Sequence, residues 1–168
     1  MLAPSLLLVL LVLGGVTARC LYTPDANGHV VVPDGVTSIG GSAFYYCKSL
    51  VSIVLPASLT LIGDSAFCGA TSLASVSFPQ SLTSIGRYAF NGATSLASVS
   101  FPKSLESIDD RAFEGATSLA SVSFPESLTS IESWAFKGAT STTTLHSVLH
   151  QVLHQLTSVM SYTSVTLV

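Results

Sequence analysis

The sequence predicts a β-solenoid of five stacked coils, mostly strand, joined by short irregular or 3-10 return arms. Two periodicities support this prediction, because prolines and phenylalanines each recur at a constant interval of about 23 residues. The prolines are Pro33, Pro56, Pro79, Pro102 and Pro125, and the phenylalanines are Phe44, Phe67, Phe90, Phe113 and Phe136. In addition, the string GATSLASVSFP occurs unchanged at 69–79, 92–102 and 115–125. A recurrence of this length indicates duplication of one structural unit.

The composition narrows the class of protein. The chain has 168 residues, of which 48% are apolar and only 9% are charged, and its formal net charge is −3. This length suits one small domain, and this apolar fraction excludes a disordered polyelectrolyte. With so few cationic side chains and a net negative charge, we expect no nucleic acid among its partners.

Each unit contains a segment with the spacing of a leucine-rich repeat strand. Leu73, Val76 and Phe78 fit the pattern L-x-x-L-x-L, and the next two units repeat these residues. Because side chains alternate along a strand, Val76 and Phe78 point into the core, while Ser75 and Ser77 point to solvent. The proline after the strand removes a backbone donor and turns the chain. The predicted fold class is a leucine-rich-repeat solenoid of five rungs, each of about 23 residues.

A column of serines lies a few residues after the strands. Many leucine-rich repeats place an asparagine ladder there, whereas four of these units have serine and the first has Gly35. Short polar side chains at turns bond backbone groups that the turn leaves free, so we expect these hydroxyls to do the same. The serines are Ser58, Ser81, Ser104 and Ser127.

The units resemble the BspA-type leucine-rich repeats over residues 30–141. The element S-x-x-x-x-A-F opens every unit except the second, where Leu61 replaces the serine, and S-L-x-x-V follows in the middle three. Many relatives have cysteine at a position where only Cys47 keeps it here, and where the later units have alanine. These alanines are Ala70, Ala93, Ala116 and Ala139. The resemblance implies a secreted or surface-exposed protein that acts in adhesion, without catalytic residues to carry over.

The N-terminal segment, residues 1–18, has the features of a secretory signal peptide. The apolar run 6–16 precedes Thr17 and Ala18, and small residues before a cut after Ala18 suit a signal peptidase. The run is shorter than the roughly 20 apolar residues that a membrane-spanning helix needs. We therefore expect a secreted or cell-surface protein with no membrane span after cleavage.

The segments that flank the repeats, which fill residues 33–141, differ from the rungs. Residues 19–32 predict an N-terminal cap, a hairpin with a tight turn at Asn27-Gly28. Residues 142–168 have two interpretations. Helical spacing of their apolar side chains predicts a C-terminal capping helix, whereas the repeated word Leu-His-Gln indicates an aberrant tail, read in a shifted frame of further repeats.

Residue types that often carry chemistry predict no catalytic, cofactor-binding or metal site. His146, His150 and His154 share helical spacing, but no Asp, Glu or Cys lies nearby to complete or orient a metal site. An acidic cluster around Arg111 matches no calcium loop and predicts a hydrated surface loop. Its members are Glu106, Asp109, Asp110 and Glu114. Without a nucleophile, phosphate-loop or zinc motif, the chain is not predicted to be an enzyme.

Three cysteines permit at most one internal disulfide. Cys20, Cys47 and Cys68 are an odd number in an oxidising compartment, so one thiol is left over. The spacing favours a bond between Cys47 and either Cys20 or Cys68, and it leaves the choice open.

The outward positions of the middle strands form a lattice of serines, which is the candidate binding face. The lattice consists of Ser75, Ser77, Ser98, Ser100, Ser121 and Ser123. Identical hydroxyls in every rung favour a repetitive partner, such as a glycan or a matrix polymer, bound through many weak contacts. The predicted function is non-enzymatic binding of an extracellular protein or carbohydrate, as in adhesion. The alternative is a passive structural repeat fragment of a larger surface protein.

Overall fold

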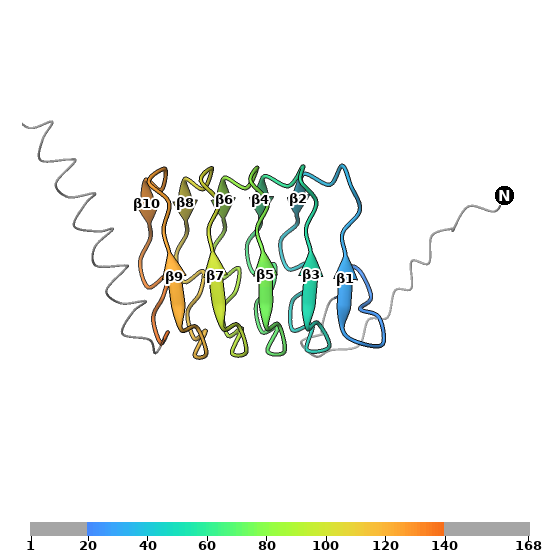
Figure 1. Ribbon diagram of the computed structural model, residues 1–168. Helices are drawn as coiled ribbons and strands as arrows, with labels where there is room; N and C mark the ends of the chain where they lie inside the picture. Colours follow the sequence, from blue (N-terminus) through green and yellow to red (C-terminus); the bar gives the residue numbers. More distant parts are fainter. Residues whose placement is uncertain (1–19, 140–168) are drawn as a thin grey trace, which may run out of the picture.

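A computed structural model describes residues 20–139, which form a β-solenoid with two parallel sheets on its sides (Figure 1). No helix occurs within these residues. The predicted solenoid is confirmed, and its return arms consist of turns that also contain a two-residue strand. The proposed signal peptide and the segment 142–168, with its capping-helix and shifted-frame interpretations and its three histidines, lie outside the described residues.

The strands repeat at the interval seen in the sequence. The first sheet contains β1 (His29–Val31), β3 (Ser52–Val54), β5 (Ser75–Ser77), β7 (Ser98–Ser100) and β9 (Ser121–Ser123), in the order β1-β3-β5-β7-β9. The second sheet contains β2 (Ser38–Ile39), β4 (Leu61–Ile62), β6 (Ser84–Ile85), β8 (Ser107–Ile108) and β10 (Ser130–Ile131), in the order β10-β8-β6-β4-β2. All pairs are parallel, and Ser52 faces Ser75 as Ser75 faces Ser98. One repeat is therefore one coil.

The first sheet has the predicted alternation of buried and exposed side chains. In β5 the side chain of Val76 is buried, and the serines on either side of it are exposed. Phe78, just after the strand, also points into the core, and Pro79 follows at the turn. The equivalent residues of β7 and β9 repeat the alternation, so the inner face of the sheet is apolar and its outer face is polar.

The second sheet is a feature that the sequence did not predict. Each of its strands has only two residues, and only the isoleucine of the pair points inward. A segment this short shows no alternation that distinguishes a strand from a turn. Its parallel pairing becomes visible only when the coils are stacked, because the hydrogen-bonding partner lies one repeat away.

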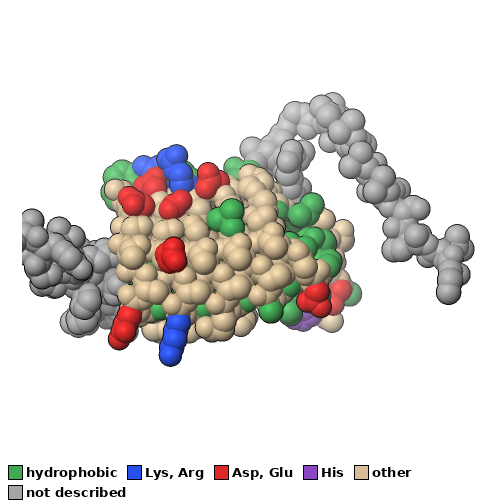
Figure 2. Space-filling model, turned by 90° about the horizontal axis from the view of Figure 1, so that it is seen from above, with side chains coloured by type: hydrophobic (Ala, Val, Ile, Leu, Met, Phe, Trp, Pro, Cys, Tyr) green, Lys and Arg blue, Asp and Glu red, His purple; other side chains and the backbone are tan. Residues whose placement is uncertain are grey.

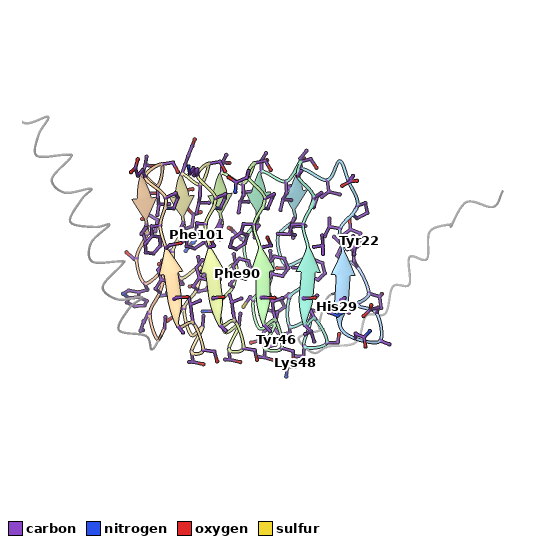
Figure 3. The ribbon with its side chains drawn as sticks, viewed as in Figure 1. Tyr22, His29, Tyr46, Lys48, Phe90 and Phe101 are labelled. Carbon is purple, nitrogen blue, oxygen red and sulfur yellow. A yellow bond between two sulfur atoms is a disulfide. The ribbon has the colours of Figure 1, made fainter. Side chains whose placement is uncertain are left out.

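Two stacks of phenylalanine rings run through the core along the axis of the solenoid. In one stack, from Phe44 to Phe136, successive ring centroids lie 4.9 to 5.1 Å apart and the rings are nearly parallel. A shorter stack runs from Phe78 through Phe101 to Phe124, with centroids 5.7 to 5.8 Å apart. Figure 3 labels one ring of each stack, Phe90 and Phe101. The two stacks meet edge to face, as between Phe101 and Phe113. Such contacts add to the burial of the rings themselves.

Backbone and serine hydrogen bonds join each coil to its neighbour outside the sheets. At the corner after the second sheet, a phenylalanine N–H donates to an alanine carbonyl of the next coil, at 2.7 Å in each case. These donors are Phe44, Phe67, Phe90 and Phe113. The predicted serine ladder is confirmed, because each hydroxyl donates to a carbonyl of the preceding coil at 2.6 to 2.8 Å. Its members are Ser58, Ser81, Ser104 and Ser127.

The N-terminal cap contains the predicted turn, but the predicted hairpin is wrong. Gly28 lies in the turn with a φ of +80°, and the Cγ2 of Val51 leaves no room there for a side chain. Strand β1 pairs in parallel with β3, and residues 20–28 form no strand beside it. Cys20 instead forms a disulfide with Cys47, one of the two pairings left open, while Cys68 is a free thiol. The cap is therefore an incomplete first coil.

Removal of one ring from the central stack should destabilise the whole solenoid. Phe90 is completely buried and stacks on the rings of both neighbouring coils. We expect Phe90→Ala to lower the free energy of unfolding by about 3 to 5 kcal/mol, as for other buried phenylalanines. Urea unfolding monitored by circular dichroism measures this change. Ser100→Ala, at an exposed position of β7, is the control and should change it by less than about 0.5 kcal/mol. Equal effects of the two substitutions would contradict the stacking described here.

Candidate binding face

The outer face of the first sheet presents two columns of side chains, one from each exposed position of the strands. The first column consists of His29, Ser52, Ser75, Ser98 and Ser121, and the second consists of Val31, Val54, Ser77, Ser100 and Ser123. The six predicted serines therefore lie side by side on one face, as the sequence indicated, and all of them are exposed. Their hydroxyls form a lattice with spacings of about 4.8 Å between strands and about 6.6 Å along a strand.

At the N-terminal end of this face, the second column is apolar rather than hydroxylated. Val31 is 70% exposed and Val54 is 59% exposed, and they are neighbours in the second column. In the first column, His29 Nδ1 forms a hydrogen bond with the hydroxyl of Ser52. This change of character was readable in the sequence, because the first units depart from the Ser-Val-Ser strand of the later ones. The second column therefore has an apolar end and a longer hydroxylated part.

A second group of surface side chains gathers at the corner that follows the second sheet. In Figure 2, acidic and basic side chains lie together along one edge of the C-terminal half, while most of the remaining visible surface is uncharged. We call this group the charged edge. It consists of Asp64, Arg87, Tyr88, Asp109, Asp110, Arg111, Glu114, Glu132, Trp134 and Lys137.

Ion pairs and cation–π contacts connect the charged edge across the coils. Asp110 pairs with Arg87 at 3.7 Å, and Glu114 pairs with Arg111 at 3.7 Å and with Lys137 at 3.6 Å. These pairs are partly exposed, so each contributes at most about 1 kcal/mol. The predicted hydrated loop around Arg111 is thus a surface region with its own ion-pair network. Sequence reasoning missed the pairs that join neighbouring coils, because their partners lie far apart in the chain.

Asp109 lies in an environment that disfavours its negative charge. Partial burial raises the pKa of Asp109, and the negative charges of Asp64 and Glu132 raise it further, while Arg87 lowers it. Asp109 and Glu132 occupy equivalent positions in adjacent coils, because they lie one repeat apart. Their like charges therefore oppose the stacking of the coils.

Two observations on the described residues concern metal binding and thiol reactivity. Across residues 20–139, no group of three or more His, Cys, Asp or Glu side chains is arranged to hold a metal ion. Burial raises the pKa of the Cys68 thiol, which lowers its fraction of reactive thiolate. The same part of the chain contains no helix that is long and apolar enough to cross a membrane.

Parallel coils of this length and strand pattern define a leucine-rich-repeat solenoid, and the comparisons identify the family. Residues 18–144 match the BspA type leucine rich repeat region in six copies. Because this match covers most of the chain, the protein belongs to the BspA-type leucine-rich repeat family. The match counts one copy more than the five units expected. No curated protein matches the chain.

Three solved structures are similar in fold and sequence. A leucine-rich repeat protein of T. pallidum is 37% identical with a TM-score of 0.65, over 70% of this chain and 63% of that one. A leucine-rich cell surface protein of Faecalibacterium prausnitzii is 32% identical with a TM-score of 0.67, over 71% of this chain and 31% of that one. A leucine-rich repeat protein of Bacteroides ovatus is 32% identical with a TM-score of 0.55, over 67% of this chain and 35% of that one. The chain therefore spans less than two thirds of each of these proteins.

The charge of Asp109 should make the stability of the protein depend on pH. A pKa that folding raises stabilises the folded state only while the carboxyl is protonated, so this contribution is lost as pH rises through the folded pKa. We expect Asp109→Asn to raise the Tm slightly at pH 7, and the difference should vanish below about pH 3. Calorimetry at both pH values measures it. Asp34→Asn, which removes an exposed carboxylate away from the charged edge, is the control. A lower Tm of Asp109→Asn at pH 7 would refute the repulsion.

Proposed function

We propose that this protein is a non-enzymatic binding module, secreted or held at the cell surface, that attaches to an extracellular protein or carbohydrate. The binding surface is the outer face of the first sheet. The observation that carries the proposal is that β5, β7 and β9 expose the same pair of serines in register. A regular array of weak hydrogen-bonding groups suits a partner that is itself repetitive, because many weak contacts then act together.

The stacked core supports this role by holding the serines in fixed positions. Each exposed serine is flanked by a buried side chain of the same strand, so the hydroxyls cannot move apart without disturbing the core. A rigid surface loses little conformational freedom when it binds. The family and the Faecalibacterium prausnitzii cell surface protein, which is 32% identical, favour a location outside the cell.

A passive structural role is the second candidate. The chain spans 31% of the Faecalibacterium prausnitzii protein and 35% of the Bacteroides ovatus protein, so a unit of this size also fits as one part of a longer solenoid. In that role the serines keep the surface soluble, and the coils act as a spacer. Binding experiments distinguish the two candidates, because a spacer has no partner of its own.

An array of matrix proteins and glycans tests the proposed face. The probe is the purified chain from Arg19 onward, alone and with Ser98→Glu and Ser100→Glu, which place two charges at the centre of the lattice. We expect binding to at least one class of glycan or matrix protein, weakened about tenfold or more by the two charges, since an unpaired buried charge is costly.

The control is a variant with the same added charge elsewhere. Ala57→Glu and Gln80→Glu lie at exposed positions in the turns after β3 and β5, so they keep the net charge of the test variant and leave the lattice intact. This control should bind like the unmodified chain. Equally strong binding by all three proteins would show that the binding site lies outside the serine lattice. Absence of any binding would favour the passive role.

A further inference from the structure

The charged edge contains three large planar side chains at one repeated position. Tyr88, Arg111 and Trp134 follow one another at intervals of one repeat, and the first two coils have Ser42 and Ser65 at the same place. Strands and core barely change between these coils, whereas this corner changes from serine to residues with large contact surfaces. Trp, Tyr and Arg are the residue types that contribute most to protein interfaces.

These three side chains are held together as a stack. The Arg111 guanidinium lies 5.4 Å from the centre of the Tyr88 ring and 4.3 Å from that of Trp134, and it donates a hydrogen bond to the Tyr88 hydroxyl. Lys137 Nζ lies 4.2 Å from the Trp134 ring. Trp134 nevertheless remains 53% exposed. The stack therefore presents an indole surface that is already ordered, so a partner that packs on it loses little additional freedom.

The charges around the stack determine which charge a partner must carry. The three cationic side chains of the edge are all engaged in ion pairs with Asp110 or Glu114. Asp64, Asp109 and Glu132 have no ion pair within residues 20–139, and carboxylates outnumber cations on this edge. Asp109 and Glu132 line a shallow hollow of about 310 Å³, together with Arg87, Asp110 and Ser133. A cationic side chain of a partner would reduce the repulsion among these carboxylates.

From these observations we infer that the charged edge is a second interaction surface, centred on Trp134, for a protein segment rich in Lys and Arg. The aliphatic stem or an apolar side chain of that segment packs on the exposed indole, and its cations lie against Asp109 and Glu132. The excess negative charge disfavours a second copy of this chain, an anionic lipid surface and a nucleic acid, since all of these would be repelled. This surface is separate from the serine face, so it does not rest on the proposed function.

Trp134 is the only tryptophan in the chain, so its fluorescence reports on this surface directly. The probes are three synthetic peptides: one that alternates Lys and Leu with Ser spacers, one with Glu in place of Lys, and one with Ser in place of Leu. We expect a saturable change of Trp134 emission with the Lys–Leu peptide. The Glu–Leu peptide should give no change, and the Lys–Ser peptide should bind about tenfold more weakly because it lacks the apolar contact.

Two matched variants locate the binding. Asp109→Asn with Glu132→Gln should raise the Kd of the Lys–Leu peptide about tenfold, because it removes the carboxylates that face the partner's cations. Asp34→Asn with Glu126→Gln removes the same charge from exposed positions outside the charged edge and should leave the Kd unchanged. Trp134→Ala removes the fluorescent reporter, so the Kd of this variant for the Lys–Leu peptide is measured by calorimetric titration. We expect the Kd to rise by the same factor. The inference is overturned by an absence of saturable binding, by equal affinity for the Lys–Leu and Lys–Ser peptides, or by unchanged affinity in the Asp109 and Glu132 variant.

Discussion

Each coil of this solenoid depends on the coil beside it, because a single repeat has one apolar layer and no second layer of its own to cover it. Rings stack on equivalent rings at about 5 Å, strands pair with strands one repeat away, and serine hydroxyls donate to the carbonyls of the neighbouring coil. All of these contacts need the same interval. A constant repeat length is therefore the constraint that holds the fold together, and it explains why core positions are nearly identical from unit to unit.

The same constraint separates the parts of the surface. On the outer face of the first sheet, exposed positions alternate with core positions within one strand, so the serines are displayed at fixed spacings. At the corner after the second sheet, the side chains project from turns and differ between coils, which allows an ion-pair network and a stack of Tyr88, Arg111 and Trp134 to develop. The molecule thus combines a face whose side chains repeat from coil to coil with an edge whose side chains differ between coils. A repeated set of side chains suits a repetitive partner, whereas a set that differs between coils suits one specific partner.

The sequence was sufficient for the features that depend on its period. It predicted the coils, the orientation of Val76 and Ser77, and the hydrogen bonds of the serine ladder. It did not reveal the second sheet, whose two-residue strands carry no periodic signal, or the parallel pairing of β1, which an Asn-Gly turn alone does not distinguish from a hairpin. The charged edge was seen as a local loop because its contacts join residues of neighbouring coils. Comparison of equivalent positions down the repeats, such as 88, 111 and 134, would have placed these residues together.

Deletion of one complete coil tests this account most directly. Removal of residues 93–115 joins Gly92 to Ala116 and restores the string GATSL at the junction, so every remaining coil keeps its register. Urea unfolding should then remain a single cooperative transition with a β-rich spectrum, at a lower denaturant midpoint because one interface between coils is lost. Removal of residues 93–104, about half a coil, should abolish the transition because it breaks the register. Loss of folding on deletion of the complete coil, or equal tolerance of both deletions, would contradict stacking in register as the basis of the fold.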